Sequence, residues 1–188
     1  MDKDSLMNSR DLLRITSRTF AIGIERLPGI LCDATTIAYL LLRVSDYLED
    51  NEDMGPDQKV TLLNLWINIL REQESVESLT CQLTDANTKN PDAIVAQHAG
   101  EILLHLHSLP YEVTEIITHH VINSTQGMAR WTKHGSNVKD EKDLDDYMFE
   151  VAGRVGYLIT QLFAWYSLTI RRKENEIMPL AREFGLGL

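Results

Sequence analysis

Cysteine is scarce in this sequence. The 188 residues contain two cysteines, Cys32 and Cys81. Two cysteines cannot build a disulfide framework, and these two do not form the CxxC pair of a redox or zinc site. The sequence therefore predicts a protein of a reducing compartment, with the cytoplasm as the expected location. The segment 1–11, MDKDSLMNSRD, has no apolar stretch and does not resemble a secretory signal.

Positive charge is also in short supply. The chain has 18 Lys and Arg against 28 Asp and Glu, a formal net charge of -10. Only the run Arg171-Arg172-Lys173 concentrates basic side chains. Because nucleic-acid binding needs a basic surface, this balance argues against DNA or RNA as a partner.

No apolar run is long enough to cross a membrane. The nearest candidate, 157–170, is interrupted by Thr160, Gln161, Ser167 and Thr169. A peripheral membrane contact stays open. A hydrophobic content of 44% and a charged content of 24% are ordinary for a globular protein, and the length suits one domain, 1–188, with a substantial core. We expect this domain to be a monomer.

Apolar residues recur at helical spacing along most of the chain, which predicts an all-α fold. We expect helices at about 5–15, 30–50, 91–107, 111–134 and 144–169, and a further helix in the stretch that contains residues 60–70. The last long helix contains Gly153 and Gly156, which are costly in a helix interior. These glycines therefore indicate a place where another helix or an apolar substrate comes close to the backbone.

The chain is centred on the stretch 38–50, AYLLLRVSDYLED. On a helix, Tyr39, Arg43, Asp46 and Asp50 share one face, with Glu49 on its flank, while apolar side chains occupy the other face. Carboxylates one turn apart can share a divalent cation that also holds phosphate oxygens. The alternative is a solvated face on which Arg43 forms an ordinary ion pair with Asp46 or Glu49.

Other polar groups allow two interpretations each. A hydroxyl and a guanidinium at Ser17 and Arg18 can hold a phosphate, or they can serve as a helix cap and a surface charge. Gln126 and Arg130 share a helix face with Asn123, and this face can point toward the acidic cluster or toward water.

Four segments together resemble the squalene and phytoene synthase family. SRTFAIGIERLP resembles the family's SR-x-F segment, and LLRVSDYLED resembles its first aspartate-rich motif in the D-x-x-E-D form. YMFEVAGRVG is similar to the family's Y-x-x-x-V-A-G-x-V-G helix, and AREFGLGL resembles the start of the helix that leads to the second aspartate-rich motif. The matches follow the family's order over nearly the whole chain.

The resemblance implies an isoprenoid synthase fold, in which helices surround a central apolar cavity, and a head-to-head joining of two farnesyl diphosphates through a cyclopropyl diphosphate. It implies that Asp46, Glu49 and Asp50 bind Mg2+, that Asp46 and Asp50 are catalytic, and that Tyr147 is the active-site tyrosine. The expected cofactors are Mg2+ and, if the product is squalene, NADPH. The candidate substrate-binding residues are Ser17, Arg18, Phe20, Tyr39, Arg43, Gln126, Arg130, Val151 and Gly153.

Two further expectations follow from the resemblance. The sequence ends where the second aspartate-rich motif would come, so we expect a piece of a longer synthase and no complete activity from the chain as printed. A phytoene or dehydrosqualene synthase would share every residue named above. A helical binding or scaffold protein that has lost the second metal site is the alternative of a different class.

Overall fold

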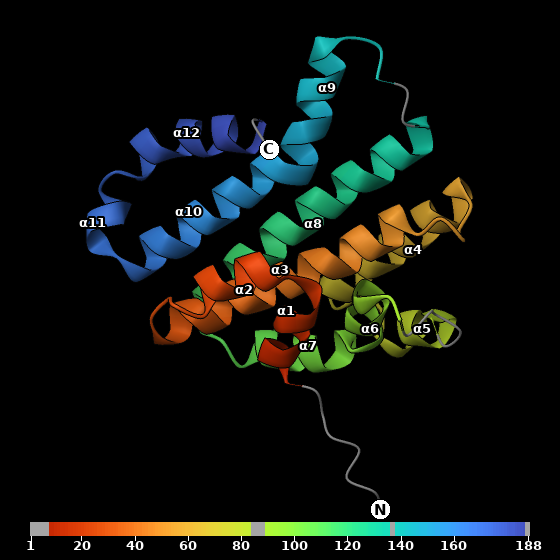
Figure 1. Cartoon of the computed structure of the whole chain (residues 1–188), viewed down its shortest axis with the longest axis horizontal. Coiled ribbons are helices and arrows are strands. Elements are labelled where there is room, and N and C mark those ends of the chain that lie inside the picture. The colour runs from red at the N-terminus through yellow and green to blue at the C-terminus, as the bar shows by residue number, and fades with distance from the viewer. Residues whose placement is uncertain (1–7, 84–88, 136–137, 187–188) are drawn as a thin grey trace, which may run out of the picture.

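The regular secondary structure of the described residues is entirely helical, without a strand (Figure 1). The structure, a computed structural model, describes residues 8–83, 89–135 and 138–186, without the side chains of residues 18 and 184–186. None of its helices is long and apolar enough to pass through a lipid bilayer. The elements are α1 (Ser9–Thr16), α2 (Arg18–Ile24), α3 (Gly29–Asp50), α4 (Pro56–Leu70), α5 (Glu77–Thr80), η1 (Cys81–Leu83), α6 (Pro91–Gln97), α7 (Ala99–His107), α8 (Tyr111–His134), α9 (Glu141–Met148), η2 (Phe149–Gly153), α10 (Arg154–Tyr166), α11 (Leu168–Arg171) and α12 (Glu174–Leu186).

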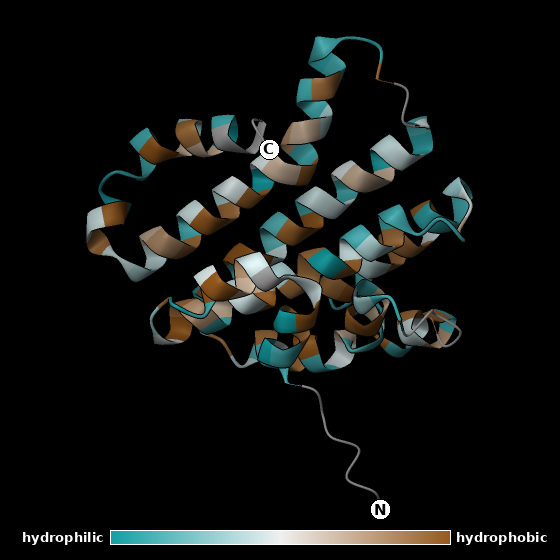
Figure 2. Cartoon of the chain, in the orientation of Figure 1, coloured by the Kyte–Doolittle hydropathy of each residue, from teal (hydrophilic) through white to brown (hydrophobic). Residues whose placement is uncertain are grey.

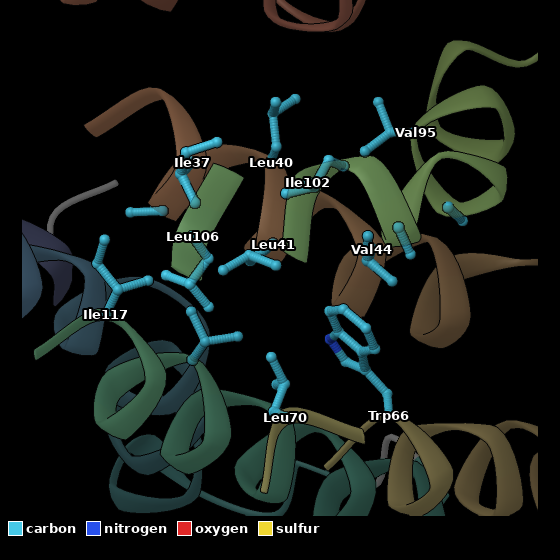
Figure 3. Packing of buried hydrophobic residues seen from close by; sticks show 14 of the residues in the cluster. Ile37, Leu40, Leu41, Val44, Trp66, Leu70, Val95, Ile102, Leu106 and Ile117 are labelled. Carbon is cyan, nitrogen blue, oxygen red and sulfur yellow. The ribbon is translucent and has the colours of Figure 1, made fainter. Parts of the chain in front are cut away.

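Helix α3 lies at the centre of the main hydrophobic core. Leu40, Leu41, Val44 and Leu48 are fully buried on it, as the helical period predicts. Figure 3 shows side chains of α4, α6, α7 and α8 converging on this face, with the Trp66 ring among them. Burial of a large apolar side chain contributes about 1.5–3 kcal/mol, so this face fixes the position of α3.

Helix α8 is the second long element, and its bounds agree with the predicted range 111–134. It packs against α3, α4 and α10. A buried polar link joins it to α3, because the Ser45 and Thr125 hydroxyl oxygens lie 2.7 Å apart. Each hydroxyl also lies within hydrogen-bond distance of a backbone carbonyl of its own helix, Ser45 of Leu41 at 3.4 Å and Thr125 of Val121 at 2.7 Å.

The predicted helix 144–169 is only partly correct. The helical segment begins earlier, at Glu141, where Asp140 caps it by accepting from the Asp143 amide at 2.9 Å. It passes through a π-helical turn, η2, and ends at Tyr166 because Ser167 is extended. The turn places the Phe149 ring against Gly153, where an added Cβ would lie 2.6 Å from Phe149 Cδ2. Figure 2 shows that α9 is mostly hydrophilic, whereas α10 carries a hydrophobic side.

Gly156 permits close contact between α10 and α12. A Cβ at this position would lie 2.5 Å from the Ala181 carbonyl oxygen, which is a backbone atom and cannot rotate away. The expected close approach of a helix at this glycine is therefore found. Gly153 instead accommodates the Phe149 ring of the same helical segment.

We predict that Gly156→Ala lowers the free energy of unfolding by about 1–3 kcal/mol, because α12 must move away from α10. Gly100→Ala is the matched control, since a Cβ there meets only Val76 at 3.6 Å, an ordinary contact. This control should be neutral or stabilising by up to about 1 kcal/mol through helix propensity. Urea denaturation of both variants measures the difference, and equal effects would contradict the predicted contact.

Candidate active site

The polar face of α3 is a half-buried acidic cluster. Asp46 and Glu49 are partly exposed, Asp50 is exposed, and the opposite side of the helix lies in the core. Because the apolar face is fixed in the core, the three carboxylates on the polar face lie together near the C-terminal end of one helix. We call Asp46, Glu49 and Asp50 the acidic cluster.

Arg43 joins the acidic cluster to α6. Its guanidinium donates to Asp46 at 2.8 Å, the ion pair considered from the sequence. It also forms a bidentate pair with Asp92, in which the Nε to Oδ1 distance is 3.1 Å. All three side chains are only 25–28% exposed, so this network is better shielded than a surface pair. Arg43 is thereby held with one side directed at the cluster.

Two carboxylates of this cluster, Asp46 and Glu49, have raised pKa values. Burial raises the pKa of Asp46 to about 6, with smaller increases from Asp50 and Asp92, while Arg43 lowers it. Burial raises the pKa of Glu49 to about 7, the neighbouring Asp50 and Asp46 add to the increase, and Lys59 opposes it. Asp46 and Glu49 therefore keep their protons to a higher pH than exposed carboxyl groups do.

Tyr147 meets the acidic cluster from α9. A pocket of about 380 Å³ is lined by Glu49, Asp50 and Lys59 on one side and by Trp131 and Tyr147 on the other. The Tyr147 ring packs edge-on against Trp131, with 5.6 Å between centroids. Burial raises the pKa of Tyr147, and the charges of Glu49, Asp50 and Asp46 raise it further. The hydroxyl is therefore a proton donor that stays neutral beside the carboxylates.

The donor set fits a magnesium ion that is shared with a phosphate ligand. Within the residues that the structure describes, no three His, Cys, Asp or Glu side chains are arranged to hold a metal on their own. Mg2+ is usually bound through one or two carboxylates together with substrate phosphates and water, so a closed protein cage is not required. The raised pKa values of Asp46 and Glu49 are relieved by a cation, which makes the cluster a suitable half-site.

The predicted residues at the start of α2 lie near α3. Ser17 caps α2, its hydroxyl accepting from the Phe20 amide at 3.1 Å, which agrees with the capping interpretation. Phe20 is 61% exposed, and its ring lies 5.9 Å from that of Tyr39. The Arg18 side chain lies outside the described residues. Phe20 and Tyr39 thus form an aromatic wall beside Arg43.

The predicted substrate-binding residues of α8 and η2 have different surroundings. Gln126 is half-buried, and Arg130 is directed to Glu150 of η2, with Nη2 to Oε1 at 2.7 Å. Val151 packs against the core cluster, and Gly153 is buried. Arg130 is therefore paired with Glu150, whereas Asp46 of the acidic cluster is paired with Arg43.

Sequence reasoning missed three residues of this region. Asp92 was missed because Asn90-Pro91 predicts a helix start, so an acidic residue there is expected for that reason alone. No local sequence pattern connects Asp92 with Arg43. Nothing in the sequence around Trp131, apart from its being a tryptophan, indicates a role in the site. Glu150 did give a signal, because it is a lone acid within the otherwise uncharged segment YMFEVAG, where an unpaired charge would be costly.

Comparisons with known proteins show the family to which the sequence is similar. The family model described as squalene/phytoene synthase matches residues 13–188. Squalene synthase from Rattus norvegicus is 30% identical over 168 residues, which cover 87% of this chain and 38% of the rat protein. Squalene synthase BSS from Botryococcus braunii is 32% identical over 182 residues, 95% of this chain and 37% of that protein.

A solved structure has the same fold. TcSQS in complex with the ligand BPH1237 superimposes with a TM-score of 0.79 at 23% identity, covering 98% of this chain and 51% of that chain. This match confirms the expected all-α isoprenoid synthase fold. The chain spans about half the length of that structure and 38% of the rat relative.

We predict that the free energy of unfolding falls as the pH rises through the range in which Asp46 and Glu49 titrate. The pKa of Asp46 rises from 3.8 to about 6 on folding and that of Glu49 from 4.5 to about 7. The folded chain thus retains protons that the unfolded chain has lost, so the free energy of unfolding decreases from about pH 4 to about pH 7. Glu49→Gln removes one charge and should raise Tm at pH 8, by roughly 2–4 °C for each kcal/mol recovered.

The same comparison at pH 4 separates this effect from a general one. There Glu49 is protonated in the folded chain, and the gain from Glu49→Gln should shrink. Glu74→Gln changes an exposed carboxyl and is the matched control, with little effect on Tm at either pH. Thermal melts without divalent cations measure all three proteins, and an equal gain at both pH values would contradict the predicted charge effect.

Proposed function

Because the chain belongs to the squalene/phytoene synthase family, we propose that it carries the diphosphate-ionising part of a prenyltransferase that joins two farnesyl diphosphates head to head. The observation that carries this proposal is the acidic cluster on α3: Arg43 pairs with Asp46, and Glu49 and Asp50 share a pocket with Tyr147 that is lined by residues of α3, α4, α8 and α9. Uncompensated carboxylates beside a guanidinium suit a substrate that brings a cation and phosphates with it.

The proposed roles combine the family resemblance with the positions of these side chains. Asp46, Glu49 and Asp50 would hold Mg2+, which would supply charge neutralisation for the leaving group. Arg43 is oriented by Asp92 and donates hydrogen bonds to the diphosphate oxygens, which stabilises charge as it develops. Asp46 and Asp50 are proposed as catalytic through this binding.

The remaining residues handle the proton and the hydrocarbon chain. Tyr147, neutral and close to the cluster, donates its hydroxyl proton toward the departing diphosphate or holds it there. Phe20, Tyr39 and Val151 border the hydrocarbon chain and keep water from the carbocation, whereas Gly153, also expected there, is covered by the Phe149 ring. Gln126, with Ser17 and Arg18, contributes polar contacts to the substrate.

The product is a separate question from the ionisation step. A squalene-forming enzyme reduces the cyclopropyl diphosphate with NADPH, whereas phytoene-type and dehydrosqualene-type enzymes need no reductant for their products. The residues of the proposed site serve both outcomes. The curated relatives named above are squalene synthases, which favours squalene and NADPH as the first pair to test.

We predict that Asp46→Asn and Asp50→Asn each lower turnover of farnesyl diphosphate by roughly 100-fold or more, because stabilisation of the leaving group is lost. Asp33→Asn is the matched control: it removes a carboxylate from the same helix that pairs with exposed Arg10. The control should retain nearly full activity. Pyrophosphate release by the full-length gene product with Mg2+ is the measurement, with and without NADPH.

The outcomes separate the alternatives. Squalene formed only with NADPH supports the squalene reading, and a product formed without it supports a phytoene-type or dehydrosqualene-type enzyme. Absence of pyrophosphate release from the full-length parent with C15 and C20 substrates would contradict the proposed function. The non-catalytic scaffold would then be favoured, and calorimetry with Mg2+ and pyrophosphate would show whether binding remains.

A further inference from the structure

Glu150 is the most buried carboxylate in the described part of the chain and has no role in the site proposed above. It is 7% exposed and lies in η2, three residues after Tyr147. A buried ion pair is weak evidence for stability, because desolvation offsets most of the attraction. Its location therefore calls for an explanation beyond general stabilisation.

Two guanidiniums hold the Glu150 carboxylate. Arg130 of α8 donates to Oε1 at 2.7 Å, and Arg154 of α10 donates to both oxygens, with Nη2 to Oε1 at 3.2 Å. Arg154 also lies over the Phe149 ring, 5.0 Å from its centroid. The carboxylate thus connects α8, η2 and the first turn of α10.

The backbone of the same residue is held as well. The Ser124 hydroxyl donates to the Glu150 carbonyl at 2.8 Å, and Ser124 is almost fully buried. Gly127 leaves the space for the side chain, because a Cβ there would lie 2.6 Å from both Glu150 Cβ and Oε2. Ser124, Gly127 and Arg130 follow one another at steps of three, so a single stripe of α8 clasps Glu150.

The π-helical turn determines which way Tyr147 points. One extra residue in a turn rotates the preceding segment by about 100° relative to the helix that follows. Helix α10 is fixed by its packing on α8 and by the contact of Gly156 with α12. The direction of the Tyr147 ring toward Trp131 and the acidic cluster therefore depends on the turn remaining π-helical.

We propose that Glu150 is a positioning residue for Tyr147: clasped by Ser124, Gly127 and Arg130, it locks the π-helical turn that aims the tyrosine at the acidic cluster. The proposal rests on the proposed function only for the consequence to turnover. Glu150 does not contact the pocket shared by Glu49, Asp50 and Tyr147, so it acts through the backbone of η2.

The test is Glu150→Gln in the full-length gene product, with 3-fluorotyrosine placed at position 147 and read by 19F NMR. We expect a resolved change in the chemical shift at Tyr147, while the same label at exposed Tyr111 stays unchanged. We also expect kcat to fall by roughly 10- to 100-fold through misplacement of the ring. KM should change by less than about twofold, because the cluster on α3 is intact.

A second variant keeps the proposal testable if Glu150→Gln does not fold. Ser124→Ala retains every charge and removes only the hydrogen bond to the Glu150 carbonyl. It should move the Tyr147 resonance in the same direction, by less. Glu141→Gln, an exposed carboxyl at the start of α9, is the matched control and should change neither the resonance nor kcat.

Opposite results overturn the proposal. An unchanged Tyr147 resonance in Glu150→Gln or Ser124→Ala, or a kcat that falls only in proportion to the unfolded fraction, would make Glu150 a structural ion pair. The NMR readout needs no turnover, so it decides the role of Glu150 even if the parent releases no pyrophosphate. That last result would count against the proposed function alone.

Discussion

The structure depends on the burial of one face of α3. Leu40, Leu41, Val44 and Leu48 are fully enclosed, and the surrounding helices are placed by their contacts with this face. Such burial contributes about 1.5–3 kcal/mol for each large side chain. It holds α3 in place while Asp46 and Glu49 on the other face lose part of their solvation, which raises their pKa values.

The cations around the acidic cluster are unevenly distributed among its three carboxylates. Arg43 is divided between Asp46 and Asp92, while Lys59 lowers the pKa of Glu49 and lines the same pocket as Glu49 and Asp50. Asp50 lines the pockets on both sides of the cluster, of about 380 and 580 Å³. Asp50 is thus the member of the acidic cluster most open to solvent.

Features that depend on neighbouring residues could be predicted from the sequence. The faces of α3 and the bounds of α8 follow from apolar periodicity, and the Arg43–Asp46 pair follows from its spacing of three. Asp92 could not be assigned, because its partner is 49 positions away and only the fold brings them together. The π-helical turn was also missed, since one extra residue hardly alters the apolar pattern on which a helix is predicted.

Trp131 connects the acidic cluster with the surroundings of Glu150. It lines both the pocket of the acidic cluster and the neighbouring pocket of about 740 Å³ that contains Arg130 and Glu150. Its ring also contacts Tyr147. A change at Glu150 therefore reaches the tyrosine by the η2 backbone and by the ring packed against it. Since α8 carries Trp131 one residue after Arg130, the helix that clasps the turn is also the helix that supports the aromatic ring, and a shift of either one moves both.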